Sequence, residues 1–268
     1  MLAVSRARCM LPSMSVRDAH GLGTFCWVDL TAFDIDMAES WYRELLGWSF
    51  DADGTSQGGG WFSSEGESVA GVRKASDAML RDKATPVWLS FVCVDDLDAM
   101  TVKATVLGGR VESAPEAVGE RGRMAIISDP QGAQLGLWQP GTHAGAQRQG
   151  QPGSVCWNEL NTPDLAASRR FYGELFGWEL VSDGGSPEYV EVRQGEHGGA
   201  GMIASEGRSA HWMVYFAVDD VEARTQAVAS SRGGVILPSR TIPGVGTFSV
   251  VSDPRGAVFA LIELESRP

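Results

Sequence analysis

The sequence contains a long internal repeat, which constrains the fold more than any other feature. The segment FCWVDLTAFDIDMAESWYRELLGWSF, from Phe25, recurs from Val155 as VCWNELNTPDLAASRRFYGELFGWEL. Residues shared at a constant offset of 130 include Trp27, Leu30, Asp34, Tyr42, Glu44, Leu45, Gly47 and Trp48, which recur as Trp157, Leu160, Asp164, Tyr172, Glu174, Leu175, Gly177 and Trp178. Self-similarity at a fixed spacing indicates a repeated supersecondary unit, so we expect the architecture to consist of copies of one unit.

Each half of the chain divides again into two modules of the order strand–helix–strand–strand–strand. In the first half we predict strands at 25–31, 60–64 and 69–74, a helix at about 36–46, a second strand–helix pair from Val87, and strands near 110–113, 123–128 and 133–139. In the second half we predict strands at 155–161, 189–193 and 199–204, a helix at 165–176, a strand–helix pair from His211, and strands near 235–239, 246–252 and 258–263. The turns DPQG and DPRG join the last two strands of each half.

The offset between the halves falls from 130 to 124 before Trp88, which matches Trp212, and a surface loop absorbs such a difference in length. The predicted fold class is α+β with four modules. We expect one domain at 23–140 and another at 155–264, a polar linker at 141–154, and a disordered N-terminal arm at 1–22.

Composition narrows the classes of partner. The formal net charge is -12 and the pI is about 4.8, which disfavours binding to nucleic acid or to an anionic membrane surface. No apolar stretch approaches the length of a membrane span. Four cysteines show no metal or disulfide spacing, and Cys26 and Cys156 are expected to be buried thiols in a reducing cytoplasm. We expect a small organic ligand and a monomer or homodimer.

These repeats resemble the vicinal-oxygen-chelate superfamily, which includes glyoxalase I, bleomycin-resistance proteins and extradiol dioxygenases. The resemblance rests on the two helix segments, on VDDLDAM and VDDVEAR, and on SDPQGAQLGLWQP and SDPRGAVFALIEL, and it covers residues 23–264. It implies that paired modules curl eight strands into an incomplete barrel around a cleft, and that four modules form two clefts. The fold alone does not give the function.

The resemblance also implies where a metal would bind, on the first and last strands of a module. The first-strand positions fall on Trp27, Leu89, Trp157 and Met213, and the last-strand positions on Gly71, Gly136, Gly201 and Ala260. None offers an oxygen, imidazole or thiolate donor. We therefore predict no cofactor, and a divalent metal remains an alternative.

Strand alternation places Trp27, Asp29 and Thr31 on one face, and Trp157, Glu159 and Asn161 on the matching face of the repeat. A carboxylate beside an indole can act as a general acid or base, or can orient a ligand. A purely structural carboxylate is the competing interpretation. We predict Glu159 and Asp29 as catalytic residues and Trp27, Trp157 and Asn161 as ligand-binding residues.

His211 begins a strand in which Met213 and Tyr215 share its face, so His211 and Tyr215 are further catalytic candidates and Met213 a ligand-binding one. The alternative is a histidine at the strand end with one surface hydrogen bond. The corresponding first-half residues are apolar. His20 and His143 fall in the predicted arm and linker and are expected to be solvated, and His197 is expected in an exposed hairpin turn.

The chain has 9 tryptophans. Trp41, Trp48 and Trp178 are predicted core residues. Trp61 and Trp138, like Trp27 and Trp157, belong either to an aromatic wall that binds the ligand or to the core. The connections at 113–122 and 239–246 could be lids or ordinary hairpin loops.

The leading hypothesis is a metal-independent tailoring enzyme of secondary metabolism, of isomerase, cyclase, lyase or hydroxylase type, that uses acid–base residues in an aromatic cleft. One alternative is a sequestration protein like the bleomycin-resistance members. The other is a metal-dependent glyoxalase or dioxygenase.

Overall fold

The computed structural model describes residues 20–54, 58–81, 85–182, 188–194, 197–207 and 209–265, and it contains four βαβββ modules. The first comprises β1 (Phe25–Ala32), α1 (Ile35–Leu46), β2 (Ser49–Ala52), β3 (Gly59–Ser64) and β4 (Glu67–Lys74), followed by the short α2 (Asp77–Arg81). The second comprises β5 (Val87–Cys93), α3 (Leu97–Val106), β6 (Arg110–Ala117), β7 (Gly122–Ser128) and β8 (Gln134–Pro140).

The second half repeats this order. The third module comprises β9 (Val155–Thr162), α4 (Leu165–Phe176), β10 (Glu179–Val181), β11 (Tyr189–Gln194) and β12 (His197–Ala204), and the fourth comprises β13 (His211–Ala217), α5 (Val221–Ser230), β14 (Gly234–Ile242), β15 (Gly246–Ser252) and β16 (Val258–Leu264). The predicted modules are confirmed; the ranges of β2, β10 and α2 were not assigned from the sequence.

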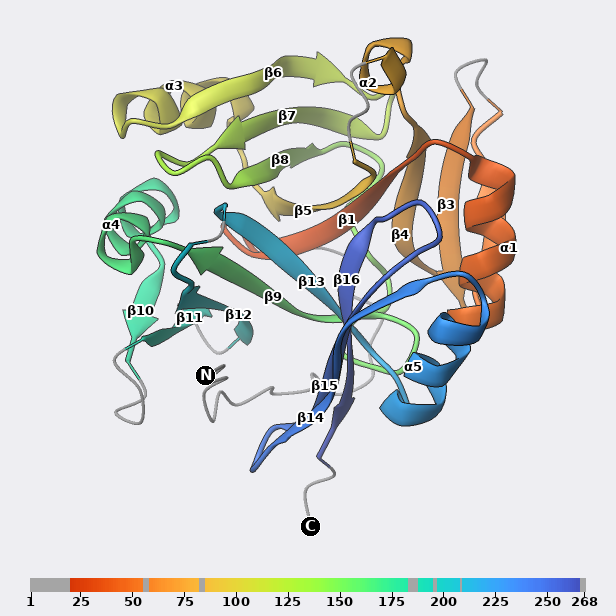
Figure 1. The fold of residues 1–268 in the computed structure, drawn as a ribbon. Coiled ribbons are helices and arrows are strands. Elements are labelled where there is room, and N and C mark those ends of the chain that lie inside the picture. The colour runs from red at the N-terminus through yellow and green to blue at the C-terminus, as the bar shows by residue number, and fades with distance from the viewer. Residues whose placement is uncertain are drawn as a thin grey trace. The chain divides into compact units, whose positions relative to one another are not determined.

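The strands form two eight-stranded sheets, one from each half of the sequence (Figure 1). Their orders are β2-β3-β4-β1-β5-β8-β7-β6 and β10-β11-β12-β9-β13-β16-β15-β14. In every module the first strand pairs in parallel with the last strand, while the hairpins between neighbouring strands are antiparallel. This parallel pair brings the two predicted metal-ligand strands of each module together.

The repeated helices have matching ends because their capping residues recur. Asp34 and Asp164 cap α1 and α4 by accepting backbone N–H bonds from Met37 and Ala167. Gly47 and Gly177 end these helices in the left-handed conformation, with φ of 72° in both, which glycine adopts without steric cost.

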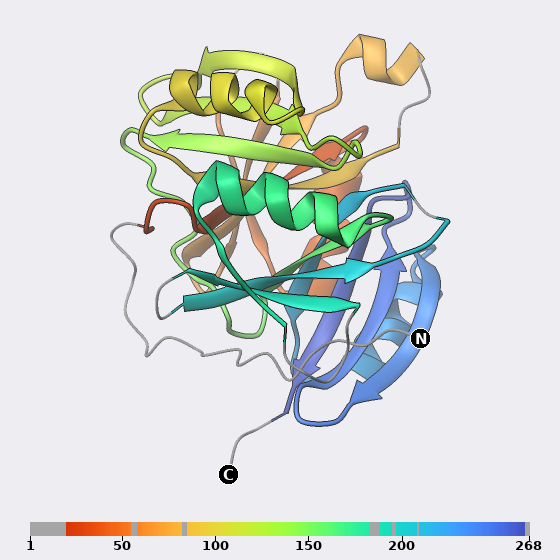
Figure 2. The ribbon, with the colours of Figure 1, turned by 90° about the vertical axis from the view of Figure 1, so that its left-hand side faces the viewer.

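The chain forms two compact units, and each unit takes parts of both sequence halves. One holds the described residues among Met1–Cys26, Ser90–Gly145 and Trp157–Met213, and the other holds those among Trp27–Leu89, Ala146–Cys156 and Val214–Pro268. Within the second unit α1 lies beside α5 (Figure 1), and within the first unit α3 lies beside α4 (Figure 2).

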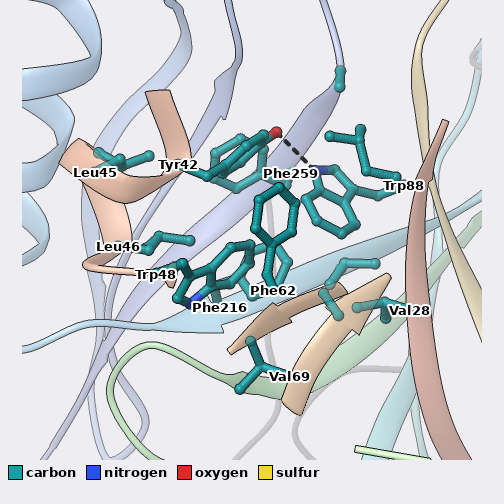
Figure 3. Close-up of a cluster of buried hydrophobic side chains, with 14 of the residues drawn as sticks. Val28, Tyr42, Leu45, Leu46, Trp48, Phe62, Val69, Trp88, Phe216 and Phe259 are labelled. Carbon is teal, nitrogen blue, oxygen red and sulfur yellow. Dashed lines mark hydrogen bonds between the residues drawn. The ribbon is translucent and has the colours of Figure 1, made fainter. Parts of the chain in front are cut away.

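Each unit has its own aromatic core, and one repeated tyrosine lies at the centre of each. In the second unit Tyr42 stacks on Trp48, and its hydroxyl accepts a 3.0 Å hydrogen bond from Trp88 Nε1 (Figure 3). In the first unit Tyr172 stacks on Trp178 and accepts a 2.9 Å bond from Trp212 Nε1. The predicted core tryptophans Trp41, Trp48 and Trp178 are all buried.

The same tyrosines join the two sequence halves. Tyr42 donates its hydroxyl proton to Asp253 of the DPRG turn at 3.4 Å, and Tyr172 donates to Asp129 of the DPQG turn at 3.2 Å. Both aspartates are buried, and burial raises the pKa of each carboxyl against the lowering effect of backbone N–H bonds. The repeated tyrosine and the repeated turn are therefore two parts of one contact.

The expectations for His20 and His143 were wrong. His20 is buried, because Gly145 packs against its ring, and His143 is half-buried, with burial and the Arg121 charge lowering the pKa of its imidazole. Of the two alternatives for segments 113–122 and 239–246, the structure shows hairpin connections: β6 ends at Ala117 and β7 begins at Gly122, while β14 ends at Ile242 and β15 begins at Gly246.

The side chain of His197 and residues 1–19 lie outside the described residues, so the predictions made for them stay predictions. Residues 141–154, the predicted linker, make specific contacts within the units: Trp48 Nε1 donates to the Gly153 carbonyl at 2.7 Å, and Gln147 accepts from Ser68. No helix in the described parts of the chain is long and apolar enough to cross a membrane.

Candidate functional site on the inner faces of the modules

Each module has one sheet face that packs on a helix and one that points away from it, which we call the inner face. Val28 and Leu30 of β1 lie in the core cluster with α1, and Leu160 of β9 lies in the cluster with α4. Because side chains alternate along a strand, the residues between them point to the inner face. These are Trp27, Asp29 and Thr31 in the first module and Trp157, Glu159 and Asn161 in the third.

The inner face of the first module holds a fixed carboxylate. Trp27 Nε1 donates a 2.8 Å hydrogen bond to Asp29 Oδ1. Asp29 is paired in register with Gly71 of β4, and a Cβ atom added to Gly71 would lie 1.9 Å from Asp29 Oδ1. Glycine is therefore required at 71 for the carboxylate to occupy this place. Trp61, which is half-buried, faces Gly71 from the other side through the β3–β4 register.

The side chain of Arg73 lies two residues further along the same pair of strands. Thr31 pairs with Arg73, and Arg73 Nε donates a 3.2 Å hydrogen bond to Thr31 Oγ1. Thr31 is buried and Arg73 is half-buried. The inner face of the first module thus presents a carboxylate, a guanidinium group and two indoles.

The third module has the same register but different side chains. Glu159 of β9 pairs with Gly201 of β12, and Gly201 pairs with Glu191 of β11, so two glutamates flank the glycine on one face. Glu159 is 1% exposed and Glu191 is 5% exposed. A Cβ atom at Gly201 would lie 2.0 Å from the hydroxyl oxygen of Tyr189, which shows that this fully buried tyrosine covers the glycine. Arg193 forms a 3.2 Å ion pair with Glu191.

The second and fourth modules place rings at the corresponding positions. Phe91 of β5 pairs with Gly136 of β8, and a Cβ atom on Gly136 would lie 2.2 Å from the Phe91 ring. Tyr215 of β13 pairs with Ala260 of β16 and is buried. In all four modules the small last-strand residue therefore faces a larger first-strand residue.

This arrangement does not fit the metal site that the superfamily resemblance implies. The last-strand positions Gly71, Gly136, Gly201 and Ala260 carry no donor, and the space above the three glycines is filled by a carboxylate, a phenyl ring and a phenol. Within the described residues, no group of three or more His, Cys, Asp or Glu side chains could hold a metal ion. Each carboxylate-bearing module offers one acidic first-strand donor here, whereas protein metal sites take several.

The structure brings together some of the predicted residues and separates others. Trp27, Asp29 and Trp61 lie around Gly71, and Trp157, Glu159 and Asn161 share one face of β9. The predicted alternation along β13 is confirmed, because Trp212, Val214 and Phe216 lie in the cores. Tyr215 belongs to the second unit, whereas Glu159 and His211 belong to the first.

The remaining candidates have local partners. His211 is half-buried, and its Nδ1 lies 2.9 Å from the Ser209 carbonyl oxygen. Met213 is half-buried on the same strand. Trp138 is buried and donates a 2.9 Å bond to the His143 carbonyl, so its indole N–H holds the segment after β8. The roles assigned to these residues stay predictions.

Sequence reasoning missed Arg73, Tyr189 and Glu191. Each lies on the third or fourth strand of a module, and each inner-face role depends on register with β1 or β9. The available signal was the pair Gly71 and Gly201, at the repeat offset of 130, because a glycine in a strand often marks close approach of another group.

Comparison with known proteins identifies what this architecture is similar to. The sequence model of the "Glyoxalase/Bleomycin resistance protein/Dioxygenase superfamily" matches residues 24–137 and 154–261. A Mycobacterium tuberculosis protein named "Putative glyoxylase CFP32" is 36% identical over 259 residues, covering 93% of this chain and 98% of the relative. "Anthracycline biosynthesis protein DnrV" of Streptomyces peucetius is 32% identical over 258 residues, covering 90% and 94%.

Solved structures share the fold. The Mn(II)-bound glyoxalase of Novosphingobium aromaticivorans aligns with a TM-score of 0.63 at 17% identity, covering 91% of this chain and 83% of that one. The 2,3-dioxygenase LapB of Pseudomonas sp. KL28 aligns with a TM-score of 0.63 at 17% identity, covering 92% and 94%.

Proposed function

The chain belongs to the glyoxalase/bleomycin resistance protein/dioxygenase superfamily, and we propose that it is a tailoring enzyme that acts on an organic small molecule by acid–base catalysis. In this proposal carboxyl groups on the inner faces do the work that a bound metal ion does in other members. Glu159 is the principal acid–base residue, and Asp29 is its counterpart in the first module.

The observation that carries the proposal is the repeated pairing of a carboxylate with a glycine across the parallel strands. Asp29 faces Gly71, and Glu159 faces Gly201. A carboxyl group held on a sheet face by its strand has little freedom to move, and such positioning is what general acid–base catalysis requires. Trp27 fixes Asp29 further through its indole N–H.

The relatives support a ligand from secondary metabolism. One relative is named as an anthracycline biosynthesis protein, and the match extends over 90% of this chain. Anthracyclines are polycyclic aromatic molecules, and each inner face that bears a carboxylate has an indole beside it that is suited to a flat ring system: Trp27 and Trp61 beside Asp29 in the first module, and Trp157 beside Glu159 in the third. We therefore place the substrate among polycyclic aromatic metabolites or their precursors.

Proton transfer accounts for the simplest reactions of this class. As a carboxylate, Glu159 accepts a proton from a carbon or oxygen atom next to a carbonyl group of the substrate. It then returns that proton to another atom of the same substrate. The substrate is isomerised or cyclised with its composition unchanged, and Glu159 returns to its starting state.

The second candidate is sequestration without turnover, and the 1% exposure of Glu159 favours it, because an enclosed carboxyl gives a substrate little access for proton transfer. The name of the mycobacterial relative suggests glyoxalase chemistry. The last-strand residues Gly71, Gly136, Gly201 and Ala260 carry no metal-binding side-chain atoms, so this chain does not fit a metal-dependent reaction at that place.

The test compares Glu159→Gln and Asp29→Asn with the wild-type protein, using an anthracycline aglycone as the probe. Calorimetry measures binding, and mass spectrometry in D2O measures conversion and incorporation of deuterium. We expect the wild-type protein to introduce deuterium, and Glu159→Gln to bind with similar affinity while its exchange falls by about 100-fold or more. Asp29→Asn should lose less.

Three outcomes contradict the proposal. Binding by the wild-type protein without conversion or exchange indicates sequestration. Unchanged exchange in Glu159→Gln removes Glu159 from catalysis. A stoichiometric divalent ion in protein purified without added metal overturns metal independence. Circular dichroism and thermal unfolding confirm that each variant is folded.

A further inference from the structure

We infer that Arg73 binds an acidic oxygen of the ligand, a carboxylate or an ionised phenol or enol, on the inner face of the first module. This inference shares one premise with the proposed function, which is that a small aromatic ligand binds at the inner face of the first module. It requires no turnover and no role for Glu159.

The guanidinium group of Arg73 is oriented by one hydrogen bond and keeps its other donors. Its Nε–H is donated to Thr31 Oγ1 at 3.2 Å, and Thr31 is only 4% exposed, so the anchor is fixed. A guanidinium group has five N–H donors in a planar fork, and the Thr31 bond takes one of them. The four N–H groups on the two η nitrogens can bind a carboxylate or phenolate with two parallel bonds.

Within the part of the chain that the structure describes, Arg73 has no carboxylate partner and lies on an inner face, whereas Arg169 and Arg224, which are also half-buried without an ion pair, lie on helices α4 and α5. Arg43, Arg123, Arg148, Arg193 and Arg255 each form an ion pair with a glutamate or an aspartate. Across the described ranges no such pair involves Arg73, although the chain has 34 acidic and 22 basic residues. A half-buried arginine without an acidic partner is suited to an anionic group supplied from outside.

The neighbours of Arg73 define the rest of the ligand. Asp29 is two residues before Thr31 on β1, so its carboxylate lies about 7 Å from the Thr31–Arg73 step along the same face. Asp29 can accept a hydrogen bond from a ligand hydroxyl while Arg73 binds the acidic oxygen. Trp61 lies across Gly71 from Asp29 and supplies a flat apolar surface. The geometry fits an aromatic hydroxy acid or a polyphenol.

The third module has no counterpart of the Thr31–Arg73 pair. We therefore assign binding of the acidic ligand oxygen to the first module. The residue at the repeat offset from Arg73 is Ile203, and the one that corresponds to Thr31 is Asn161. Ile203 is buried and carries no donor. A ligand anion would therefore be recognised by one of the two repeated inner faces.

The test measures binding of a matched pair of probes, anthraquinone-2-carboxylate and anthraquinone-2-carboxamide, by titration calorimetry. The variants are Arg73→Gln, Arg73→Lys and Thr31→Val, and Arg123→Gln is the control because Arg123 pairs with Asp98 on another module. We expect Arg73→Gln to raise the Kd of the carboxylate by about 10- to 100-fold. The Kd of the carboxamide should change by less than about 3-fold.

Two further variants and a third probe separate the charge of Arg73 from its geometry and orientation. Arg73→Lys keeps the charge but loses the fork, so its Kd should lie between those of wild type and Arg73→Gln. Thr31→Val should raise the carboxylate Kd by about 3-fold, because only the orientation of Arg73 is lost. A hydroxyanthraquinone probe separates the two acidic groups: tighter binding above its own pKa indicates that a phenolate is also accepted.

The inference is overturned if Arg73→Gln weakens both probes equally or neither, or if Arg123→Gln has the same effect. It is also overturned if the folded wild-type protein binds neither probe. That last outcome leaves the exchange assay on Glu159 unaffected, so failure here is distinguishable from failure of the proposed function.

Discussion

The inner faces of the first and third modules have the same strand register, yet they expose different chemistry. In the first module the short side chain of Asp29 covers Gly71, and Arg73 lies beside it. In the third module Tyr189 covers Gly201, and the longer Glu159 is buried. The backbone pairing is the same in both modules, whereas the side chains leave the carboxylate of one face half-buried and enclose that of the other.

The largest effect that tests this comparison is expected from filling the two glycines. Gly201→Ala places a Cβ atom 2.0 Å from the Tyr189 hydroxyl oxygen, and Tyr189 is fully buried and cannot move aside. We expect a loss of about 3 kcal/mol in the free energy of unfolding. Gly71→Ala should cost about 1 kcal/mol, because Asp29 is half-buried and can turn toward solvent from the new methyl group at the cost of its hydrogen bond to Trp27. Urea unfolding measures both, and equal losses would contradict the difference in enclosure.

Removing the hydroxyl group of the repeated tyrosine should destabilise both units by the same amount. Tyr172→Phe leaves Asp129 without its 3.2 Å donor and Trp212 Nε1 without its 2.9 Å acceptor. Tyr42→Phe removes the corresponding pair of bonds in the other unit. We expect each variant to lose about 2 kcal/mol of unfolding free energy, because buried polar groups lose partners. A difference between the variants of more than about 1 kcal/mol would show that the cores have diverged as the inner faces have.

The smallest effect concerns pH. Burial raises the folded-state pKa of Asp129 and Asp253 above 3.8, so the folded chain binds these protons more tightly than the unfolded chain does. Their contribution to stability is therefore largest below the unfolded-state pKa, and it declines as the pH rises through the raised folded-state pKa.

The neutral variants Asp129→Asn and Asp253→Asn remove the titrating carboxyl group, but they keep a side-chain oxygen that accepts the backbone N–H bonds of the turn. Thermal unfolding between pH 4 and 7 should show each variant gaining stability relative to wild type as the pH rises. A constant or shrinking difference would contradict the raised pKa. Tyr172→Phe should steepen the trend for Asp129, since the tyrosine bond is one of the influences that lower its pKa.

The sequence predicted the modules well because their signals are local. Asp34 and Gly47 limit α1, and their repeats limit α4 to the predicted residues 165–176. The inner-face candidates Asp29 and Glu159 followed from strand alternation. Arg73 and Tyr189 could not be placed in this way, because their position depends on which residue of a distant strand they pair with. That register depends on how the hydrophobic faces of both strands are buried together, which the sequence of one strand alone does not show.

His20 shows a further limit. Nothing around it in the sequence indicates burial, and its environment is provided by Gly145, more than a hundred residues away. The contact of Gly71 with Asp29, which shapes the inner face of the first module, is non-local in the same sense.

The contact between each repeated tyrosine and the DPxG turn of the opposite half has a consequence for how such a chain could have arisen. A polypeptide with one half only would possess the tyrosine and the turn but would lack the partner of each. Two copies could complete each other by exchanging the same contacts, as a symmetric dimer. The present chain is therefore equivalent to such a dimer with its subunits joined end to end, and the joining allows each half to carry different residues on its inner face.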